Sequence, residues 1–528
     1  MAWGEMVITH PLKTRFEARI LDITAGVSVV ILNEEEATEN DIFTGDRLVV
    51  DNRGKQTIAT VDVSKTIVKR GEIALFADVA EKIEAKRGDK LVVAQTGSPA
   101  SIDLIKKKMD GGVLQEHEVK TIIDELMENK LTDVELSSFI TSLYIRGLNT
   151  EETVALTKAI VRSGKTLDFG DAHPIVDKHC TGGVAGNRTT MLIVPIVAAA
   201  GLYMPKTSSR SITSAAGTAD TMEVLANVEF TLEEMKKMVL KTHGCIVWGG
   251  GMNLASADDK LIKIRHPMRL DPKGVMVASV LAKKKAVGAE LVAIDIPVGR
   301  GAKITSMDVA NELAREFIVI SAKLGMKSEV FITYGRDPVG CGIGPALECR
   351  DVLEALQGRG PADLVQKSCK LAGAILEMGG KAEPGRGYAI ALELLQNGKA
   401  YQKMKEIIEA QGGNPNVKPD DLPIGQYREQ FYAQEDGRIH LVDNKAVNRI
   451  ARAAGAPKSK GSGMILHVES GDKVKKGQLL FEIISESETK LSFASELAKD
   501  INPIELEAVI LGKMGETGVF EWKPETAR

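Results

Sequence analysis

A glycine-rich segment between two apolar runs has the residue types that bind a phosphate group. Residues 177–190 read Asp-Lys-His-Cys-Thr-Gly-Gly-Val-Ala-Gly-Asn-Arg-Thr-Thr. Their order predicts a strand, a turn and a helix. Gly182 and Gly183 allow the backbone to approach an anion, and the helix start offers free N–H groups at its positive end. Lys178 and Thr190 add a charge and a hydroxyl. The structural alternative is a tight turn that binds nothing.

A second segment, residues 206–223, is dense in serine and threonine around a single arginine, Arg210. Short hydroxyl side chains and a guanidinium group are well suited to phosphate oxygens. We expect a helix to begin at Asp220, where Asp-Thr-Met-Glu-Val-Leu follows the polar stretch. The alternative is a polar loop whose hydroxyls only cap helices.

A third segment, residues 256–283, combines acidic and basic side chains on the approach to a predicted helix. Asp271 follows Arg265 and the helix-breaking Pro267. This arrangement can present a carboxylic acid to a cleft, where it would serve in proton transfer. The alternative is a solvated, charged surface stretch.

Helices and strands must position these three segments, and the spacing of hydrophobic residues changes several times along the chain. Residues 1–95 carry β-branched runs and two similar phrases, Thr-Gly-Asp-Arg-Leu-Val-Val from Thr44 and Arg-Gly-Asp-Lys-Leu-Val-Val from Arg87. The repetition predicts a duplicated, barrel-like β unit. Helical spacing follows, with predicted N-caps at Thr132 and Asn149.

The remaining chain predicts an α/β protein of several domains, because single cores stop growing near 250–300 residues. We expect a helical lobe and a large α/β lobe with a cleft between them, the N-terminal β-rich unit, and a C-terminal α+β domain. The predicted boundaries are 1–95 for the β-rich unit, 101–166 and 256–289 for the helical lobe, 170–255 and 290–420 for the α/β lobe, and 425–528 for the C-terminal domain.

Composition excludes several classes of function. The 528 residues are 44% hydrophobic and 27% charged, with a net charge of -4, which gives no electrostatic footprint for nucleic acid. The five cysteines show no C-x-x-C pair, and no H-E-x-x-H occurs, so we expect neither a disulfide framework nor a zinc site. The start lacks the regions of a signal peptide and the longest apolar run contains a proline, so we expect a cytoplasmic protein with no membrane segment.

Together the three segments resemble the thymidine/pyrimidine-nucleoside phosphorylase family, over about residues 101–525. The family's Lys-His-Ser-Thr-Gly-Gly-Val signature is present as Lys-His-Cys-Thr-Gly-Gly-Val from Lys178. Its Ser-x-Arg block, which continues to Gly-Thr-x-Asp-x-x-Glu, runs from Ser208 to Glu223. Its base-binding stretch is matched by Arg265, Ser279 and Lys283.

Departures from this family point to a nucleotide substrate. Cys180 replaces the usual phosphate-binding serine, which removes a strong hydrogen-bond donor. Residues 210–214, in contrast, carry hydroxyls where the nucleoside enzymes have glycines and a histidine, and Lys303 stands where they have an uncharged residue. Both changes add anion-binding capacity. The N-terminal unit, Asp271 and residues 298–303 resemble the archaeal branch of the family, which acts on nucleotides.

The resemblance implies a role for each group of residues. It makes Asp271 the proton donor to the departing base, which requires a pKa raised toward neutrality. The residues implied to bind inorganic phosphate are Lys178, Thr190, Ser208 and Thr218, with Gly183. Those implied to bind the nucleotide are Gly183, Ser209, Arg210, Ser211, Ile212, Thr213, Ser214, Thr218, Arg265, Ser279 and Lys303.

The implied reaction is phosphorolysis of a nucleoside 5′-monophosphate, with AMP favoured and CMP and UMP as further candidates. AMP and phosphate would give adenine and ribose 1,5-bisphosphate. We expect no cofactor or metal, and a homo-oligomer, because the family dimerises through its helical lobe. The alternatives are a thymidine or uridine phosphorylase, an anthranilate-type phosphoribosyltransferase, whose magnesium-binding motifs are not evident, and a non-catalytic assembly protein that keeps the fold.

Overall fold

The chain forms two compact units in a computed structural model that describes residues 14–97, 99–507, 513–515 and 518–520. One unit comprises Met1–Gly164 and Ala255–Ala282, and the other comprises Lys165–Leu254 and Lys283–Arg528. The backbone therefore passes between the units three times.

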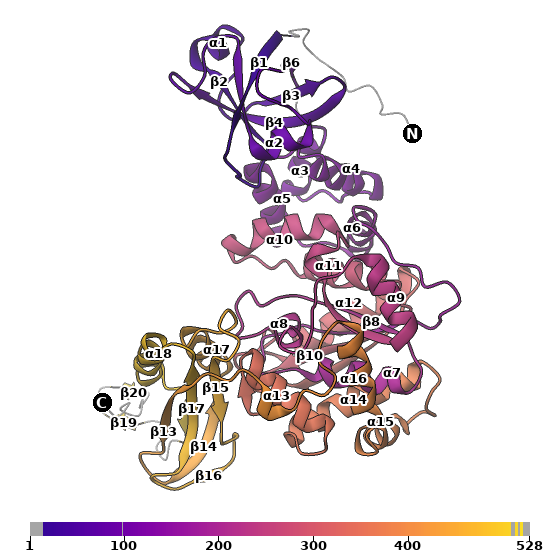
Figure 1. The fold of residues 1–528 in the computed structure, drawn as a ribbon, viewed down its shortest axis with the longest axis vertical. Coiled ribbons are helices and arrows are strands. Elements are labelled where there is room, and N and C mark those ends of the chain that lie inside the picture. Colours follow the sequence, from indigo (N-terminus) through magenta and orange to yellow (C-terminus); the bar gives the residue numbers. More distant parts are fainter. Residues whose placement is uncertain (1–13, 98, 508–512, 516–517, 521–528) are drawn as a thin grey trace. The chain divides into compact units, whose positions relative to one another are not determined.

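The N-terminal part of the first unit is a closed barrel with strand order β1-β5-β2-β4-β3-β6 (Figure 1). The two similar phrases lie on β3 and β6, which pair antiparallel with Val50 opposite Val93. Along β3 buried and partly exposed residues alternate, as expected where one face lines a core. The elements are β1 Thr14–Leu21, β2 Val29–Asn33, α1 Glu34–Glu39, β3 Arg47–Asn52, β4 Lys55–Ser64, β5 Glu72–Phe76, α2 Ala77–Lys82 and β6 Lys90–Gln95.

The rest of the first unit is helical. Thr132 and Asn149 cap helices α5 and α6 through capping boxes with Glu135 and Glu152, so both predicted caps are confirmed. The apolar faces meet in one core that includes Phe139. The helices are α3 Ser101–Met109, α4 Glu116–Met127, α5 Asp133–Arg146, α6 Thr150–Arg162, α10 Ser256–Met268 and α11 Lys273–Ala286, the last of which continues into the second unit.

The second unit is built on parallel strands, and two of them, β9 Gly244–Trp248 and β10 Leu291–Val298, are largely buried, as in sheets covered on both faces. Strands β11, β10 and β7 form one sheet and β8 and β9 another, and a parallel bridge between Ile175 and Tyr203 links them. The elements are β7 Val176–Cys180, α7 Thr189–Ala199, β8 Met204–Ser208, α8 Thr218–Met222, α9 Leu232–Thr242, β9 Gly244–Trp248, β10 Leu291–Val298, α12 Met307–Lys323, β11 Lys327–Tyr334, α13 Pro345–Leu356, α14 Ala362–Met378, α15 Gly387–Gln396 and α16 Lys399–Ala410.

The C-terminal part of the second unit contains a sheet of order β12-β15-β17-β13 (Figure 1). Strand β12 precedes α13 in the α/β part and pairs with β15, so this sheet joins the two parts. The elements are β12 Gly342–Ile343, β13 Tyr427–Tyr432, β14 Gly437–Val442, α17 Asn444–Ala453, β15 Gly463–Leu466, β16 Lys473–Val474, β17 Leu479–Ser485, α18 Glu488–Ile501, β18 Ile504–Leu506, β19 Lys513–Gly515 and β20 Gly518–Phe520.

The predicted fold class is therefore confirmed: a helical part, an α/β part, an N-terminal barrel and a C-terminal α+β part. One local prediction is wrong, because α8 begins at Thr218 and not at Asp220. Asp220 is the third residue of the helix, and its carboxylate accepts the N–H of Gly217 at 2.8 Å. Within the described ranges, no helix is long and apolar enough to cross a membrane.

Candidate active site

Three loops that carry predicted site residues lie at one edge of the second unit's strands. They follow β7, β8 and β10 at residues 181–188, 209–217 and 299–306. Strand β10 pairs in parallel with β7, and β7 is bridged in parallel to the chain entering β8. The carboxyl ends of parallel strands meet at the same edge, which is where α/β proteins bind ligands. The loops after β7 and β8 also lead directly into helix N-termini.

The loop after β7, residues 181–188, is called the phosphate loop below, after the ligand predicted for it. Gly183 has φ +94°, and a Cβ atom there would lie 2.3 Å from the backbone nitrogen of Lys303. Gly186 has φ +66°, and its Cβ would lie 2.4 Å from the carbonyl oxygen of Val339. Only glycine fits either position. The close approach at Gly183 brings the phosphate loop against the loop of Lys303, so two predicted site residues are neighbours.

Lys178 is buried in β7 beneath the start of α7. Its side chain is 2% exposed, and Nζ donates to the hydroxyl of Thr189 at 3.0 Å. The carboxylate of Asp295 lies 3.8 Å from the same Nζ. Thr190, the second residue of α7, is also buried. The positive charge of Lys178 is thus fixed below the helix N-terminus, where both favour an anion.

A buried ionic network supports this strand, and the sequence did not reveal it. The carboxylate of Asp177 accepts from Lys206 Nζ at 3.1 Å and from Lys284 Nζ at 2.6 Å. Burial raises the pKa of Asp177, but the two lysines outweigh it and hold the pKa below its ordinary value. Burial lowers the pKa of Lys206 to about 7 and also lowers that of His179 well below its ordinary value, which keeps the imidazole neutral. Asp177 follows the apolar Pro174-Ile175-Val176, but nothing in that segment indicates Lys206 or Lys284 as its partners.

Cys180 stands at the end of β7, at the position of the family's phosphate-binding serine. The sulfur accepts from Asn187 Nδ2 at 3.4 Å. Burial, with a contribution from Asp295, raises the pKa of the thiol. The side chain therefore stays protonated and neutral, and a thiol is a weak hydrogen-bond donor.

The loop after β8, residues 209–217, is called the hydroxyl loop. It is folded around Asp220, whose carboxylate accepts the N–H groups of Ser211 at 2.7 Å and Gly217 at 2.8 Å. The hydroxyls of Ser211 and Ser214 lie 3.2 Å apart, and Ser214 donates to Ala216 O at 2.9 Å. Ile212 and Thr213 are exposed. Ser208 ends β8, and the carbonyl of Ser209 accepts from Ala219 N–H at 3.4 Å.

Arg210 does not point freely into solvent, because acidic side chains already bind it. Its guanidinium donates to Glu223 at 2.7 and 2.6 Å and to Glu229 at 2.8 Å, and it lies 5.1 Å from the ring centroid of Trp248. Hydrogen bonds from Arg210 lower the pKa of Glu223 to about 2, and Lys460 contributes. Substrate must therefore displace or share these contacts if it is to reach the Arg210 charge.

Arg188, which the sequence analysis did not single out, connects the two loops. Its guanidinium donates to Thr218 Oγ1 at 3.0 Å and to the carbonyl of Ala216 at 2.8 Å, and it is paired with the buried Glu348. Arg188 is the last residue of the phosphate loop, and Thr218 begins α8 after the hydroxyl loop. The ends of both loops are therefore fixed relative to each other.

The remaining predicted residues form a second group, in the first unit. Arg265 Nη1 donates to Asp271 at 3.0 Å. Ser279 is buried in α11, and its hydroxyl donates to Asp258 at 2.7 Å. The predicted site residues thus lie in two groups, one in each unit.

Comparison with known proteins assigns the class of this chain. The model of the glycosyl transferase family helical bundle domain matches residues 102–164, and that of the family's a/b domain matches residues 172–401. The fold also resembles that of anthranilate phosphoribosyltransferase from Thermus thermophilus, with a TM-score of 0.51 and 20% identity over 59% of this chain and all of that one.

Relatives with much higher sequence identity indicate a narrower class of enzyme within this family. An AMP phosphorylase of Pyrococcus furiosus is 48% identical over 94% of this chain and 99% of its own length. An AMP phosphorylase of Methanocaldococcus jannaschii is 44% identical over 94% of this chain and 99% of its own length. The chain belongs to the glycosyl transferase family of which these AMP phosphorylases are members.

Proposed function

We propose that this chain catalyses the phosphorolysis of AMP to adenine and ribose 1,5-bisphosphate. The observation that carries the proposal is the approach of Gly183 to the backbone of Lys303, which brings the phosphate loop against the loop that carries a further lysine, at one edge of the strands. The relatives named AMP phosphorylase, at 44–48% identity over 94% of the chain, support the same reaction. An enzyme that transfers the ribose 5-phosphate of AMP from adenine to inorganic phosphate must bind two phosphoryl groups at once.

The phosphate loop and its neighbours hold the attacking phosphate. Lys178 supplies the charge, Thr190 a hydroxyl and Gly183 backbone access, with Ser208 and Thr218 as further hydroxyls. Cleavage of the bond between C1′ and the base develops positive charge on the ribose, as in glycoside hydrolysis. An oriented phosphate converts a bimolecular step into a nearly unimolecular one, an effect worth up to about 7–11 kcal/mol.

The hydroxyl loop and Lys303 hold the 5′-phosphate of the nucleotide. Ser209, Ser211, Ile212, Thr213 and Ser214 supply backbone and hydroxyl groups, and Arg210 shares its guanidinium between Glu223 and substrate. In the first unit, Asp271 donates a proton to the departing adenine, and Arg265 and Ser279 contact the base. Exclusion of water from the bound nucleotide lets phosphate attack instead.

A release assay for free base tests the proposal. We expect adenine to form from AMP only when phosphate is present, with kcat/KM for AMP at least about tenfold above that for adenosine, because a charged hydrogen bond contributes roughly 1.5–3 kcal/mol. The assay is run in excess EDTA, since we propose that no metal takes part. A preference for adenosine would overturn the substrate, and loss of activity in EDTA would favour a magnesium-dependent phosphoribosyltransferase.

Lys303 provides the matched variant for this assay. Lys303→Met removes the proposed 5′-phosphate contact, and the AMP preference should fall by about 10–100-fold while adenosine turnover changes little. Lys327→Met, at an exposed lysine that begins β11, serves as the control.

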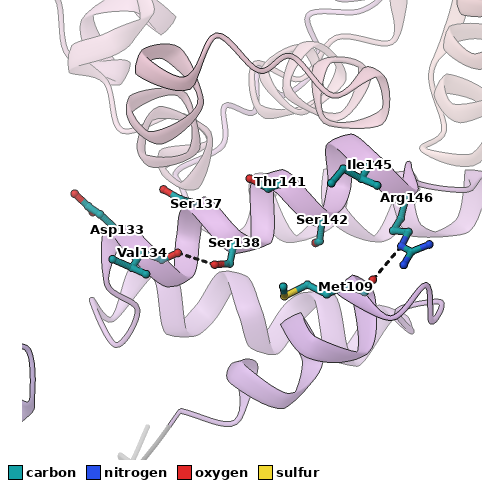
Figure 2. A pocket seen from close by; sticks show the side chains of 9 residues that line it. All are labelled: Met109, Asp133, Val134, Ser137, Ser138, Thr141, Ser142, Ile145 and Arg146. Carbon is teal, nitrogen blue, oxygen red and sulfur yellow. Dashed lines mark hydrogen bonds between the residues drawn. The ribbon is translucent and has the colours of Figure 1, made fainter.

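We further propose that the chain is a cytoplasmic homo-oligomer that associates through α5. A groove of about 560 Å³ runs along this helix, lined by Met109, Asp133, Val134, Ser137, Ser138, Thr141, Ser142, Ile145 and Arg146 (Figure 2). Val134 is 76% exposed and Ile145 is 69% exposed. Apolar side chains so exposed on one helix favour burial against a second copy.

Sedimentation velocity tests the oligomer. We expect Ile145→Asp to lower the assembly mass, because a charge at an apolar interface is costly to desolvate. Leu240→Asp, at an exposed leucine on α9, should leave the mass unchanged. A wild-type monomer, or an Ile145→Asp protein of unchanged mass, would exclude this interface.

A further inference from the structure

Helix α17 of the C-terminal part hydrogen-bonds to both anion-binding loops, and we propose that it is a positioning element for them. Asn444 holds the phosphate loop, and Asn448 and Arg452 hold the hydroxyl loop. The inference rests on the proposed function, because it assigns phosphate to one loop and the nucleotide 5′-phosphate to the other. It gives the C-terminal part a role in the reaction without contact with substrate.

Asn444 is a buried amide whose hydrogen bonds all go to loop backbone. Its Oδ1 accepts the N–H of Ala185, in the phosphate loop, at 2.8 Å. Its Nδ2 donates to the carbonyls of Gly335 at 3.3 Å and Arg336 at 2.9 Å, after β11. A Cβ atom at Gly301 would lie 3.2 Å from the Asn444 Cβ, so the loop of Lys303 also packs here. One side chain therefore contacts the loops after β7, β10 and β11.

Asn448 lies one turn further along α17 and serves the hydroxyl loop. Its Oδ1 accepts the N–H of Ala215 at 2.8 Å, and its Nδ2 donates to the Asn444 carbonyl at 2.8 Å. One more turn along, Arg452 Nη1 donates to the carbonyl of Ser214 at 3.0 Å. Residues spaced four apart share one face of a helix. This face of α17 meets both loops in succession.

The helix that carries these side chains is firmly anchored. Val447, Ile450 and Ala451 are buried in the core of the C-terminal part. Asp443 caps the helix by accepting the N–H groups of Lys445 and Ala446 at 2.7 and 2.8 Å. A fixed helix can hold loop backbone in place, and small misplacements of a binding loop are costly to catalysis. Because the bonds from α17 go to backbone atoms, α17 itself occupies no side chain of the two loops.

Single substitutions on α17 test the proposal through separate substrate constants. We expect Asn444→Ala to raise KM for phosphate by about tenfold with a smaller change in KM for AMP. Asn448→Ala and Arg452→Ala should raise KM for AMP by about tenfold with a smaller change in KM for phosphate. Asn448→Asp keeps the acceptor for Ala215 and should restore most of the AMP affinity. Lys445→Ala and Arg449→Ala, at exposed positions of the same helix, are the controls.

A second measurement separates this inference from the proposed function. Hydrogen exchange should show faster exchange of residues 181–188 in Asn444→Ala and of residues 209–217 in Asn448→Ala, with the melting temperature recorded for each. If the wild-type protein shows no phosphorolysis but the variants still show faster loop exchange, the positioning role is supported and the proposed reaction is excluded. Equal changes in both KM values, effects as large in the control variants, or unchanged loop exchange would overturn the positioning role. Asn448 and Arg452 are only partly buried or exposed, so their variants test it even if Asn444→Ala does not fold.

Discussion

Replacing Lys178 with methionine should lower kcat/KM for phosphate by about 10²–10³-fold, the loss seen when one preorganised donor to a developing charge is removed. The ammonium group lies beneath the start of α7, bound to Thr189 at 3.0 Å, and its side chain is 2% exposed. In such a water-poor site a fixed charge acts on an anion far more strongly than in solvent. Initial rates at saturating AMP over a range of phosphate concentrations measure the effect.

The control for this prediction must separate binding from folding. Methionine matches the lysine stem but leaves Asp295 with one fewer cation, although Lys367 Nζ remains 3.3 Å from its carboxylate. Some loss of stability is therefore expected, and the melting temperature is measured alongside. Lys178→Arg keeps the charge and should retain more activity. If the folded Lys178→Met protein binds phosphate as tightly as wild type, the phosphate loop is not the phosphate site.

Local patterns in the sequence predicted the features that depend on local physics. The glycines at 182 and 183 adopt positive φ in the turn between β7 and α7, where a turn of this shape requires them. The repeated phrases at Thr44 and Arg87 became neighbouring strands of a closed barrel. The glycine turn is encoded within a few consecutive residues, whereas the barrel was indicated by the repetition of a locally encoded strand.

Features made by distant residues could not be predicted in this way. Ala185 and Asn444 are 259 positions apart, and no local pattern in either segment indicates that the two residues are in contact. The network of Asp177, Lys206 and Lys284 joins two strands and a helix. The start of α8 was misplaced for a different reason. Asp220 accepts N–H groups at the third position of the helix, and in a sequence an aspartate there resembles an N-cap.

The pairing of Arg210 also changes how the predicted site is understood. The sequence showed one guanidinium among hydroxyls, which favours an open anion site. In the structure Glu223 and Glu229 bind that guanidinium, and Lys460 binds Glu223 at 2.5 Å. The charge of Arg210 is thus largely neutralised by two carboxylates that follow α8 in the chain, those of Glu223 and Glu229. In the proposed mechanism, Lys303, whose side chain is exposed, is then the main cation for the 5′-phosphate.

Asp271→Asn should lower kcat by at least about 100-fold while leaving phosphate binding nearly intact. General acid catalysis contributes about 10²–10⁴-fold, and an amide cannot donate the proton that the departing adenine needs. The substitution preserves shape, and the amide oxygen can still accept from Arg265, so the helical part should keep its stability. Single-turnover release of adenine, with phosphate binding followed by calorimetry, measures both quantities.

The ion pair between Arg265 and Asp271 affects how the result of this experiment is interpreted. Arg265 Nη1 lies 3.0 Å from the Asp271 carboxylate, so contact of Arg265 with the base requires that this ion pair be broken or shared when the nucleotide binds. In the proposed mechanism Arg265 then contacts the base, and Asp271 donates the proton. Asp110→Asn, at an exposed aspartate of the same unit, controls for a general loss of charge. An unchanged kcat would remove Asp271 from the chemistry, and an equal loss of phosphate affinity would make its role structural.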